Sequence, residues 1–250
     1  MISEARKSES VLITGGASGI GLACARLVAD RGARVAIVDL DLSAAERAIG
    51  DLAGDGHVAI GADVTDADAM RNAADQLGRA GGITGLVAAA GIVSRSSLLE
   101  IDVSEFRRVL DINVVGVQNT ISAAGSHLIR ADPFASVVVL GSAAAFTGGG
   151  LMGNGAYATS KAALIGLVRG YARELAPHGI RVNMVAPGAT ETPMTDVLSV
   201  GDRHRIAGLS LLGRLSRAEE IAAAVAFLLA PDVGTITGQI LHVNGGVVFG

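Results

Sequence analysis

The sequence predicts one α/β domain built on a doubly wound, parallel β-sheet. Short apolar runs alternate along the chain with longer segments of helical pattern, an arrangement typical of such sheets. No break in composition and no linker divides the 250 residues. Half of the residues are hydrophobic and 18% are charged, so the chain carries enough apolar material for a sizeable core.

The bulk composition also excludes several classes of protein. A net charge of −4 argues against a nucleic-acid partner, which needs a basic face. No apolar run reaches the roughly 18 residues that span a bilayer. The single cysteine, Cys24, rules out an intramolecular disulfide and is expected to be a buried helical residue. Residues 1–9 are polar and are expected to form a flexible tail before a domain of residues 10–250, and a cytoplasmic location is expected.

The first strand leads directly into a glycine-rich turn. Val11–Ile13 is a continuous apolar run, as in a strand buried on both faces, and a helical pattern extends to about Asp30. Between them the chain reads Thr-Gly-Gly-Ala-Ser-Gly-Ile-Gly, residues 14–21. Glycines at a strand-to-helix turn let the backbone approach a pyrophosphate, and the helix N-terminus offers free amides. A tight turn without a ligand is the alternative.

The second strand, residues 34–38, ends in Asp39. This carboxylate lies 18 residues beyond Gly21, close to the spacing at which an acid binds the adenosine ribose of a dinucleotide. Its charge would repel a 2′-phosphate, and Leu40 and Asp41 supply no cation to receive one. The pattern therefore favours NAD over NADP. An aspartate that only caps the turn is the alternative.

The later elements continue the alternation. Further strands are expected at residues 57–62, 86–90, 136–140, 181–186 and 239–243. Helix starts are expected at a capping box Ser43–Glu46, at Thr65, and at a capping box Ser216–Glu219. A long helical pattern covers residues 104–130, and residues 190–213 are expected to form a substrate loop or lid.

Four polar residues gather where these strands end. Ser142 follows the fifth strand, and Tyr157 and Lys161 lie one turn apart on one face of the next helix. A phenol beside an ammonium can move protons near neutral pH, although such a pair alone is common by chance. Asn113 interrupts an apolar helical stretch and must satisfy its amide there, either at a site or as a bridge between backbones.

These motifs together resemble the short-chain dehydrogenase/reductase family, in its branch of roughly 250 residues. The matching segments are Thr14–Gly21, Asp39, Asp63-Val64, Ala90-Gly91, Asn113, Ser142, Tyr157 with Lys161, Pro187-Gly188 with Thr192, and a terminal pair of glycines. The resemblance implies a Rossmann-type sheet of seven parallel strands with helices on both faces. It also implies hydride transfer between a nicotinamide and an alcohol or ketone, and assembly as a homotetramer through the helices of residues 104–130 and of Tyr157.

The resemblance implies a role for each matched residue. Tyr157 would be the general acid/base, Lys161 would lower its pKa and hold the nicotinamide ribose, and Ser142 would polarise the substrate oxygen. Asn113 would kink its helix and hold a water in the proton relay. The implied cofactor-binding residues are Gly15, Ser18, Gly19, Ile20, Gly21, Asp39, Leu40, Asp63, Val64, Ala90, Gly91, Tyr157, Lys161, Pro187, Gly188, Thr190 and Thr192.

The chain also departs from the family pattern. Ala88 and Ala89 stand where asparagines are common, and the 15 residues from Ser142 to Tyr157 exceed the expected spacing by two. The extra length falls in Gly148–Gly150, so substrate choice is expected to depend on this loop. Candidate pocket residues on the two variable loops are Phe146, Leu151, Met152, Met194, Val197, Leu198, Leu209 and Leu211.

Other polar residues receive weaker assignments. Arg95 follows the fourth strand and could pair with a substrate carboxylate or be a solvated surface residue. The five histidines show no metal-binding spacing, so no metal site is expected. The leading prediction is an NAD-dependent alcohol dehydrogenase or carbonyl reductase acting on a small molecule. The alternatives are an NADP-linked ketoreductase and a non-catalytic dinucleotide-binding regulator.

Overall fold

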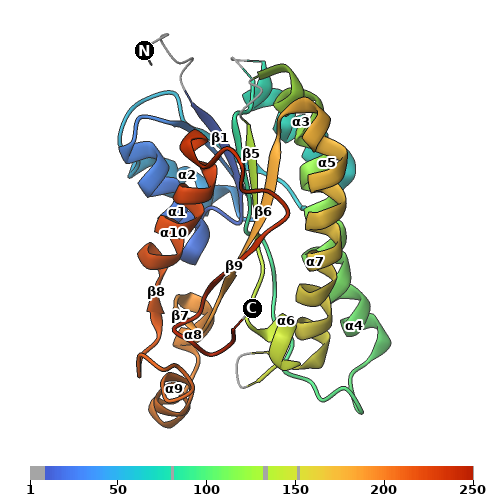
Figure 1. Ribbon diagram of the computed structural model, residues 1–250, viewed down its shortest axis with the longest axis vertical. Coiled ribbons are helices and arrows are strands. Elements are labelled where there is room, and N and C mark those ends of the chain that lie inside the picture. Colours follow the sequence, from blue (N-terminus) through green and yellow to red (C-terminus); the bar gives the residue numbers. More distant parts are fainter. Residues whose placement is uncertain (1–8, 80–81, 132–134, 151–152, 250) are drawn as a thin grey trace.

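The computed structural model describes residues 9–79, 82–131, 135–150 and 153–249. These residues form a seven-stranded sheet in which every pair of neighbours is parallel (Figure 1). Across the sheet the strands are β3 (Val58–Gly61), β2 (Arg34–Asp39), β1 (Ser10–Thr14), β4 (Gly85–Ala88), β5 (Ser136–Leu140), β6 (Arg181–Pro187) and β9 (Ile240–Val243). The predicted doubly wound sheet is confirmed, and its strand ends differ from the predicted ones by at most two residues.

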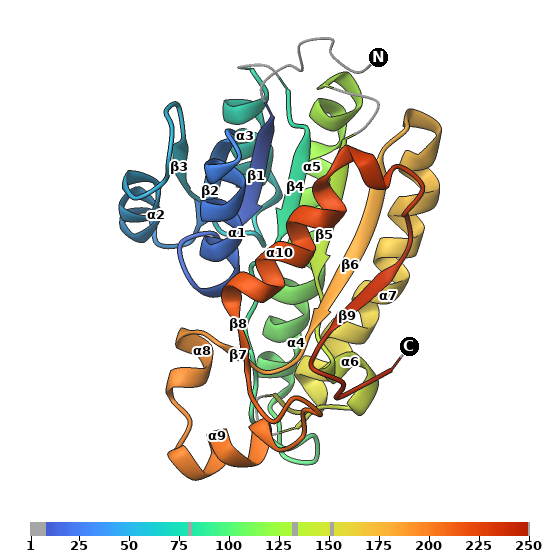
Figure 2. The same cartoon turned by 60° about the vertical axis from the view of Figure 1, so that its left-hand side comes forward.

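Helices cover both faces of this sheet (Figures 1 and 2). One face carries α1 (Gly19–Asp30), α2 (Leu42–Gly50) and α10 (Ala218–Leu229). The other carries α3 (Ala67–Gly78), α5 (Gly116–Ala131) and α7 (Gly155–Leu175). Successive strand residues alternate between the two cores, as Leu12 and Ile13 do, because side chains of a strand point to opposite faces. Both faces are therefore buried, which explains the unbroken apolar runs.

Two buried polar residues tie the end of α10 to the sheet. Arg181, at the start of β6, donates to the carbonyls of Leu228 (2.7 Å) and Ala230 (2.9 Å). The Ser136 hydroxyl donates to the same Leu228 carbonyl (2.9 Å). The last carbonyls of a helix have no partner within the helix, so these side chains satisfy groups that burial would otherwise leave unpaired.

Two helices have N-caps two residues and one residue away from the predicted ones. Asp41, not Ser43, caps α2, since its carboxylate accepts from the amide of Ala44 (3.0 Å). Asp66, not Thr65, caps α3. Thr65 is already engaged, because its hydroxyl donates to Asp63 (2.8 Å). A carboxylate also gains from the positive N-terminal end of the helix dipole, which favours it over a hydroxyl.

The predicted capping box Ser216–Glu219 is also shifted by one residue. The N-cap of α10 is Arg217, and its amide donates to the carboxylate of Glu220 (2.7 Å). That carboxylate also pairs with both terminal nitrogens of Arg214, at 2.8 and 2.7 Å. This ion pair selects Glu220 over its neighbour Glu219, and it also fixes the chain as it leaves the lid.

The long helical segment of residues 104–130 is present, with one irregular turn. Helix α4 (Val103–Leu110) continues through a π-helical turn, Asp111–Val115, into α5. Asn113 lies in this turn, and π-helical turns are often found at functional sites.

The predicted lid of residues 190–213 contains two short helices, α8 (Pro193–Asp196) and α9 (Val200–Ala207). Its two stems meet in a small parallel pair, where β7 (Thr190–Glu191) aligns with β8 (Ser216–Arg217). The lid lies beyond the carboxyl ends of the strands (Figure 2). No helix in the described part of the chain is long and apolar enough to cross a membrane.

Candidate active site

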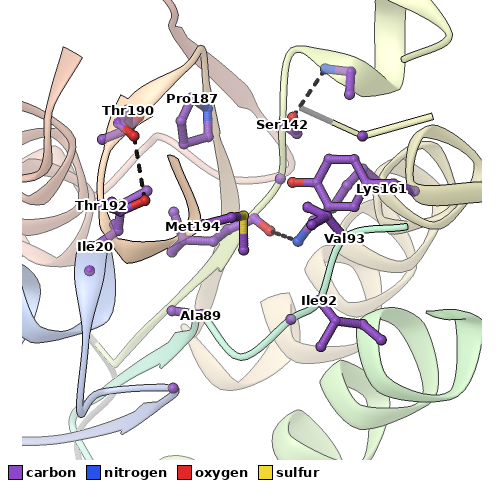
Figure 3. A pocket seen from close by; sticks show the side chains of 18 of the residues that line it. Ile20, Ala89, Ile92, Val93, Ser142, Lys161, Pro187, Thr190, Thr192 and Met194 are labelled. Carbon is purple, nitrogen blue, oxygen red and sulfur yellow. Dashed lines mark hydrogen bonds between the residues drawn. The ribbon is translucent and has the colours of Figure 1, made fainter. Parts of the chain in front are cut away.

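A cavity of about 850 Å³ opens at the carboxyl ends of the strands, under the lid. Every predicted catalytic and cofactor-binding residue lines it except Asn113, which lies behind its wall. In Figure 3, Ser142 and Lys161 lie on one side of the pocket, and Thr190 and Thr192 lie on the other. Residues from seven separate segments of the chain thus share one space, at the edge of the sheet where open α/β folds bind ligands.

The glycine-rich turn between β1 and α1 forms a cradle that side chains would fill. Gly15 has a φ of 66°, and a Cβ placed on it would lie 2.8 Å from the Cα of Ala90. A Cβ on Gly21 would lie 2.1 Å from the carbonyl oxygen of Gly15. Glycine is therefore required at both positions, and the N-terminus of α1 stays open to the cavity. This cradle fits a pyrophosphate, because the first amides of the helix have no partner within it.

Thr192 lies next to this turn, at the cavity wall. A Cβ on Gly19 would lie 3.4 Å from the Thr192 side chain, so the turn and the start of α8 face each other closely. The Thr192 hydroxyl donates to the carbonyl of Thr190 (3.4 Å), and the Thr190 hydroxyl donates to that of Gly188 (3.1 Å). This wall of the cavity is therefore held by its own hydrogen bonds.

Asp39 ends β2 at the rim of the same cradle. One carboxylate oxygen accepts from the amide of Ala17, and the other accepts from the amide of Asp41, both at 3.2 Å. The carboxylate thus braces the turn, as the capping alternative expected. It also lines the cavity, and its orientation is fixed by these bonds.

Asn113 is fully buried, and its side chain joins three segments. Its oxygen accepts from the amide of Ile92 (2.8 Å), and its nitrogen donates to the Ile92 carbonyl (2.9 Å). The same nitrogen donates to the hydroxyl of Ser160 (2.9 Å), which in turn donates to the carbonyl of Tyr157 (2.7 Å). The Asn113 side chain therefore bridges neighbouring segments of the chain, which is one of the two roles expected for it. Ser160, which connects Asn113 to the helix of Tyr157, was not predicted from the sequence.

Ser142, Tyr157 and Lys161 lie together at the cavity wall. Burial raises the pKa of the Tyr157 phenol, and a hydrogen bond with Ser142 opposes that rise. The Lys161 nitrogen lies 5.7 Å from the centre of the Tyr157 ring and donates to the carbonyl of Leu140 (2.8 Å). Burial lowers the pKa of Lys161 to about 8. Burial is the larger of the two effects on Tyr157, so the pKa of its phenol lies above the ordinary value.

Comparison with known proteins agrees with this architecture. A family model described as enoyl-(acyl carrier protein) reductase matches residues 15–248. The cis-4-hydroxycyclohexanecarboxylate dehydrogenase of Sinomonas cyclohexanicum is 38% identical over 248 residues, which cover 97% of this chain and 98% of that protein. The chain belongs to the short-chain dehydrogenase/reductase family. Its members are oxidoreductases that bind nicotinamide cofactors.

Other members of the short-chain dehydrogenase/reductase family are equally similar over their full lengths. The 3-oxoacyl-(acyl-carrier-protein) reductase of Escherichia coli is 37% identical over 240 residues, covering 94% of this chain and 96% of that one. A crystal structure of a glucose/ribitol dehydrogenase of this family from Brucella melitensis superposes with a TM-score of 0.91, at 32% identity, over all of both chains. These relatives act on different compounds, so membership in the family leaves the substrate open.

The loop and lid residues of this family member divide into two groups. Met194 and Leu209 line the cavity as predicted, whereas Phe146, Val197, Leu198 and Leu211 do not. Phe146 instead packs edge-on against His242, with ring centres 4.7 Å apart. Leu151 and Met152 lie outside the described residues. Periodicity alone could not separate these apolar residues, because mobile and packed loop positions use the same side chains.

The arginines that line the cavity are not the one that was considered from the sequence. Arg95 is exposed and does not line the cavity, whereas Arg108 of α4 and Arg214 do. No spacing in the sequence singles out either of them. Among the described residues, no cluster of histidine, cysteine and acidic side chains could hold a metal ion. Ala88, at one of the two positions where asparagine is common in the family, ends β4 and is paired with both β1 and β5.

Proposed function

We propose that the protein is an NAD(H)-dependent oxidoreductase that transfers a hydride between nicotinamide and a secondary alcohol or ketone. The observation that supports it best is that Ser142, Tyr157 and Lys161 line one cavity together with the glycine cradle, with the Lys161 nitrogen 5.7 Å from the centre of the Tyr157 ring. A proton donor and a dinucleotide-binding turn in the same space are what such a reaction requires.

Each residue then has one task. The bound nicotinamide supplies or accepts the hydride. Ser142 holds the substrate oxygen and stabilises the charge that develops on it. Tyr157 gives its proton to that oxygen during ketone reduction and takes the hydroxyl proton during alcohol oxidation. Lys161, fixed by the Leu140 carbonyl, places a cation below the phenol and favours its ionised form.

The preference for NAD rests on Asp39. Its carboxylate is held at the rim of the cradle, where the adenosine ribose is expected, and it would repel a 2′-phosphate. Among described residues that line the cavity, the basic ones are Arg108, Lys161 and Arg214. Lys161 donates to Leu140 and Arg214 is paired with Glu220. Titration of the protein with NADH and NADPH tests this preference, and tighter binding of NADPH would reverse it.

The role of Tyr157 is tested by Tyr157→Phe, which keeps the ring and removes the proton. Turnover should fall by about a hundredfold to ten-thousandfold, since general acid–base catalysis typically contributes a factor of 10²–10⁴. Binding of NADH should stay intact. The chain offers a matched control in Tyr171→Phe, because this second tyrosine of α7 is distant from the cavity lining and makes only a long bond to Gln118 (3.4 Å).

Two results would contradict this function. Unchanged turnover in Tyr157→Phe would exclude Tyr157 as the proton donor. Binding of NADH without any absorbance change on a panel of ketones and secondary alcohols would favour a non-catalytic dinucleotide-binding regulator. Assembly as a homotetramer also stays a prediction, which light scattering on the purified protein tests.

A further inference from the structure

One basic residue of the cavity wall has no partner in the protein itself. Arg108 of α4 is exposed and lines the cavity, yet it forms no hydrogen bond or ion pair with any residue that the structure describes. The other two cations of the described lining are engaged. Lys161 donates to the carbonyl of Leu140 (2.8 Å), and Arg214 is paired with Glu220 (2.7 Å). Arg108 is therefore the cation that this wall offers to a ligand.

The fold itself gives Arg108 no task. Glu105 lies three residues earlier on the same helix, where an ion pair would be possible, but its carboxylate accepts from the hydroxyls of Ser94 (2.7 Å) and Ser96 (2.9 Å). A basic residue in the last turn of a helix can also complement the helix dipole. Helix α4, however, continues through the π-helical turn into α5, so Arg108 does not stand at a free helix end.

A row of residues along this helix shows where Arg108 lies. Gly116 is buried against the segment that follows β3, because a Cβ on it would lie 2.6 Å from Cγ2 of Val64. Four residues earlier, the half-buried Ile112 lines the cavity, and four residues before that comes Arg108. Residues at this spacing share one face of a helix. The row thus runs from the Val64 wall outward to Arg108 at the mouth of the cavity.

The glycine-rich turn lies on the other side of the same space. A Cβ on Gly15 would lie 2.8 Å from the Cα of Ala90, and a Cβ on Gly91, which follows Ala90, would lie 3.1 Å from Oδ1 of Asn113 in the π-helical turn. The segment after β4 therefore separates the turn from the helix of Arg108. Figure 1 shows the same arrangement, with α1 and α4 on opposite sides of the sheet. A dinucleotide whose diphosphate rests on the turn has α4 along its other side.

The charges in this space favour a cation beside the diphosphate. The carboxylates of Asp39 and Asp63 line the cavity, and residues 14–21 of the turn contain no charged side chain. A diphosphate adds two negative charges, which the amides and the helix dipole of α1 balance only in part. A guanidinium presents several N–H donors in one plane and binds phosphate oxygens in pairs.

We propose that Arg108 binds the diphosphate of the dinucleotide, on the side opposite the glycine-rich turn. The diphosphate is then held by backbone amides on one side and by a guanidinium on the other. Arg108 adds affinity for any ligand that carries this diphosphate, with or without the nicotinamide. This inference rests on the proposed function, since it needs a dinucleotide in the cavity.

The experiment measures binding and not turnover. The wild type and Arg108→Met are titrated with NADH, NADPH, ADP-ribose, which has the diphosphate without the nicotinamide, and adenosine, which lacks the diphosphate. The Kd for NADH and for ADP-ribose should rise about five- to tenfold in the variant, because water partly screens an exposed charge. The Kd for adenosine should not change. Arg108→Lys keeps the charge without the planar fork and should show a smaller loss.

Salt provides a second readout, which a change in the shape of the cavity would not alter. A loss that is caused by charge shrinks as ions screen it, and at about 1 M salt the screening length falls to about 3 Å. The ratio of the two Kd values for ADP-ribose, variant over wild type, should therefore fall at least about twofold between low salt and this concentration.

The matched control is Arg107→Met. Arg107 is the preceding residue of α4, is also exposed and without a bond to any described residue, and lies outside the cavity lining. This variant removes the same charge from the same helix and should bind all four ligands as the wild type does. It separates a contact with the diphosphate from a general loss of positive charge.

Each other result overturns the inference. Equal Kd values for NADH in the wild type and Arg108→Met would mean that Arg108 does not reach the cofactor. A larger loss for NADPH than for NADH would mean that Arg108 faces the 2′-phosphate, and an equal loss for adenosine would mean that it contacts the nucleoside. A loss that salt does not change would exclude a charge interaction. In these cases the wild type still binds NADH, so the proposed function stands, whereas a wild type that binds no dinucleotide would contradict the proposed function.

Discussion

Replacement of Lys161 by methionine should yield an inactive protein that is no less stable than the wild type at pH 7. Lys161 is 5% exposed, and burial lowers its pKa from 10.5 to about 8. Methionine has a similar length and no charge to bury. A residue kept at a cost to stability is typical of a functional site, so this variant separates a catalytic role from a structural one.

The magnitude follows from the pKa. A displacement from 10.5 to about 8 corresponds to about 3 kcal/mol against the charged side chain in the folded protein, at roughly 1.4 kcal/mol for each pH unit. The variant gains this amount but leaves the carbonyl of Leu140 without its donor, which costs about 1–3 kcal/mol. The two effects nearly offset each other at pH 7, and the net free energy of unfolding should rise by about 0–2 kcal/mol.

The pH dependence of that difference is the sharper measurement. Below pH 8 the lysine is protonated in both the folded and the unfolded protein, so the full cost of burying the charge is present. Between pH 8 and 10.5 the folded protein loses this proton first, unfolding takes a proton up, and wild-type stability therefore rises with pH relative to the variant.

Urea unfolding of both proteins at pH 7 and pH 10 provides the assay. The difference in the free energy of unfolding should move by about 2–3 kcal/mol in favour of the wild type as the pH rises. Titrating groups remote from Lys161 are common to both proteins and cancel, and Tyr157→Phe introduced into both proteins removes the neighbouring phenol, whose titration depends on Lys161. A difference that is the same at both pH values, or a variant several kcal/mol less stable at pH 7, would refute the reasoning, because Lys161 would then be a stabilising structural cation.

Three further predictions concern the groups around this site. Ser160→Ala removes the link from Asn113 to the carbonyl of Tyr157, so kcat should fall about tenfold with little change in KM. Ser160→Thr keeps a hydroxyl and should restore kcat. An equal loss of kcat in both variants would contradict a positioning role for Ser160. The rate of alcohol oxidation should rise with pH while the rate of ketone reduction falls, because Tyr157 must be ionised to accept a proton and protonated to give one. Parallel pH profiles in the two directions would exclude Tyr157 as the group that exchanges the proton. Arg181→Met removes the donor of the Ala230 carbonyl, whereas Ser136 still donates to the Leu228 carbonyl. The free energy of unfolding in urea should therefore fall by about 1–3 kcal/mol, with activity per folded molecule unchanged.

Most of the fold could be read from the sequence, because the signals are local. The run Val11–Ile13 and its counterparts are apolar on both faces, and such runs form strands that helices cover on both sides. The helix starts were less predictable. Around α2 the acceptors Asp39, Asp41 and Ser43 lie within five residues, and the cap is Asp41, whose extended backbone comes directly before the first helical residue. That conformation depends on the preceding strand, which residue types alone do not specify.

The site residues that could be predicted are those whose positions follow from a single helix or from the end of a single strand. Tyr157 and Lys161 are placed by helical spacing, and Ser142 by the end of β5. Ser160 was missed because its partner Asn113 lies 47 residues earlier in the chain. The rise that burial causes in the Tyr157 pKa was not predicted either, since it depends on how much water the whole assembled cavity excludes.

The two halves of the cavity differ in how they are held, and this difference has a functional consequence. Near the reacting groups, side chains bond directly to backbone, as Asn113 does to Ile92 and Lys161 does to Leu140. A substitution there breaks several bonds at once and should damage the chemistry. At the mouth, the lid contributes apolar side chains such as Met194 and Leu209. A substitution of a lid residue leaves the bonds around the reacting groups in place and changes the shape of the space, so we expect it to alter substrate choice more than proton transfer.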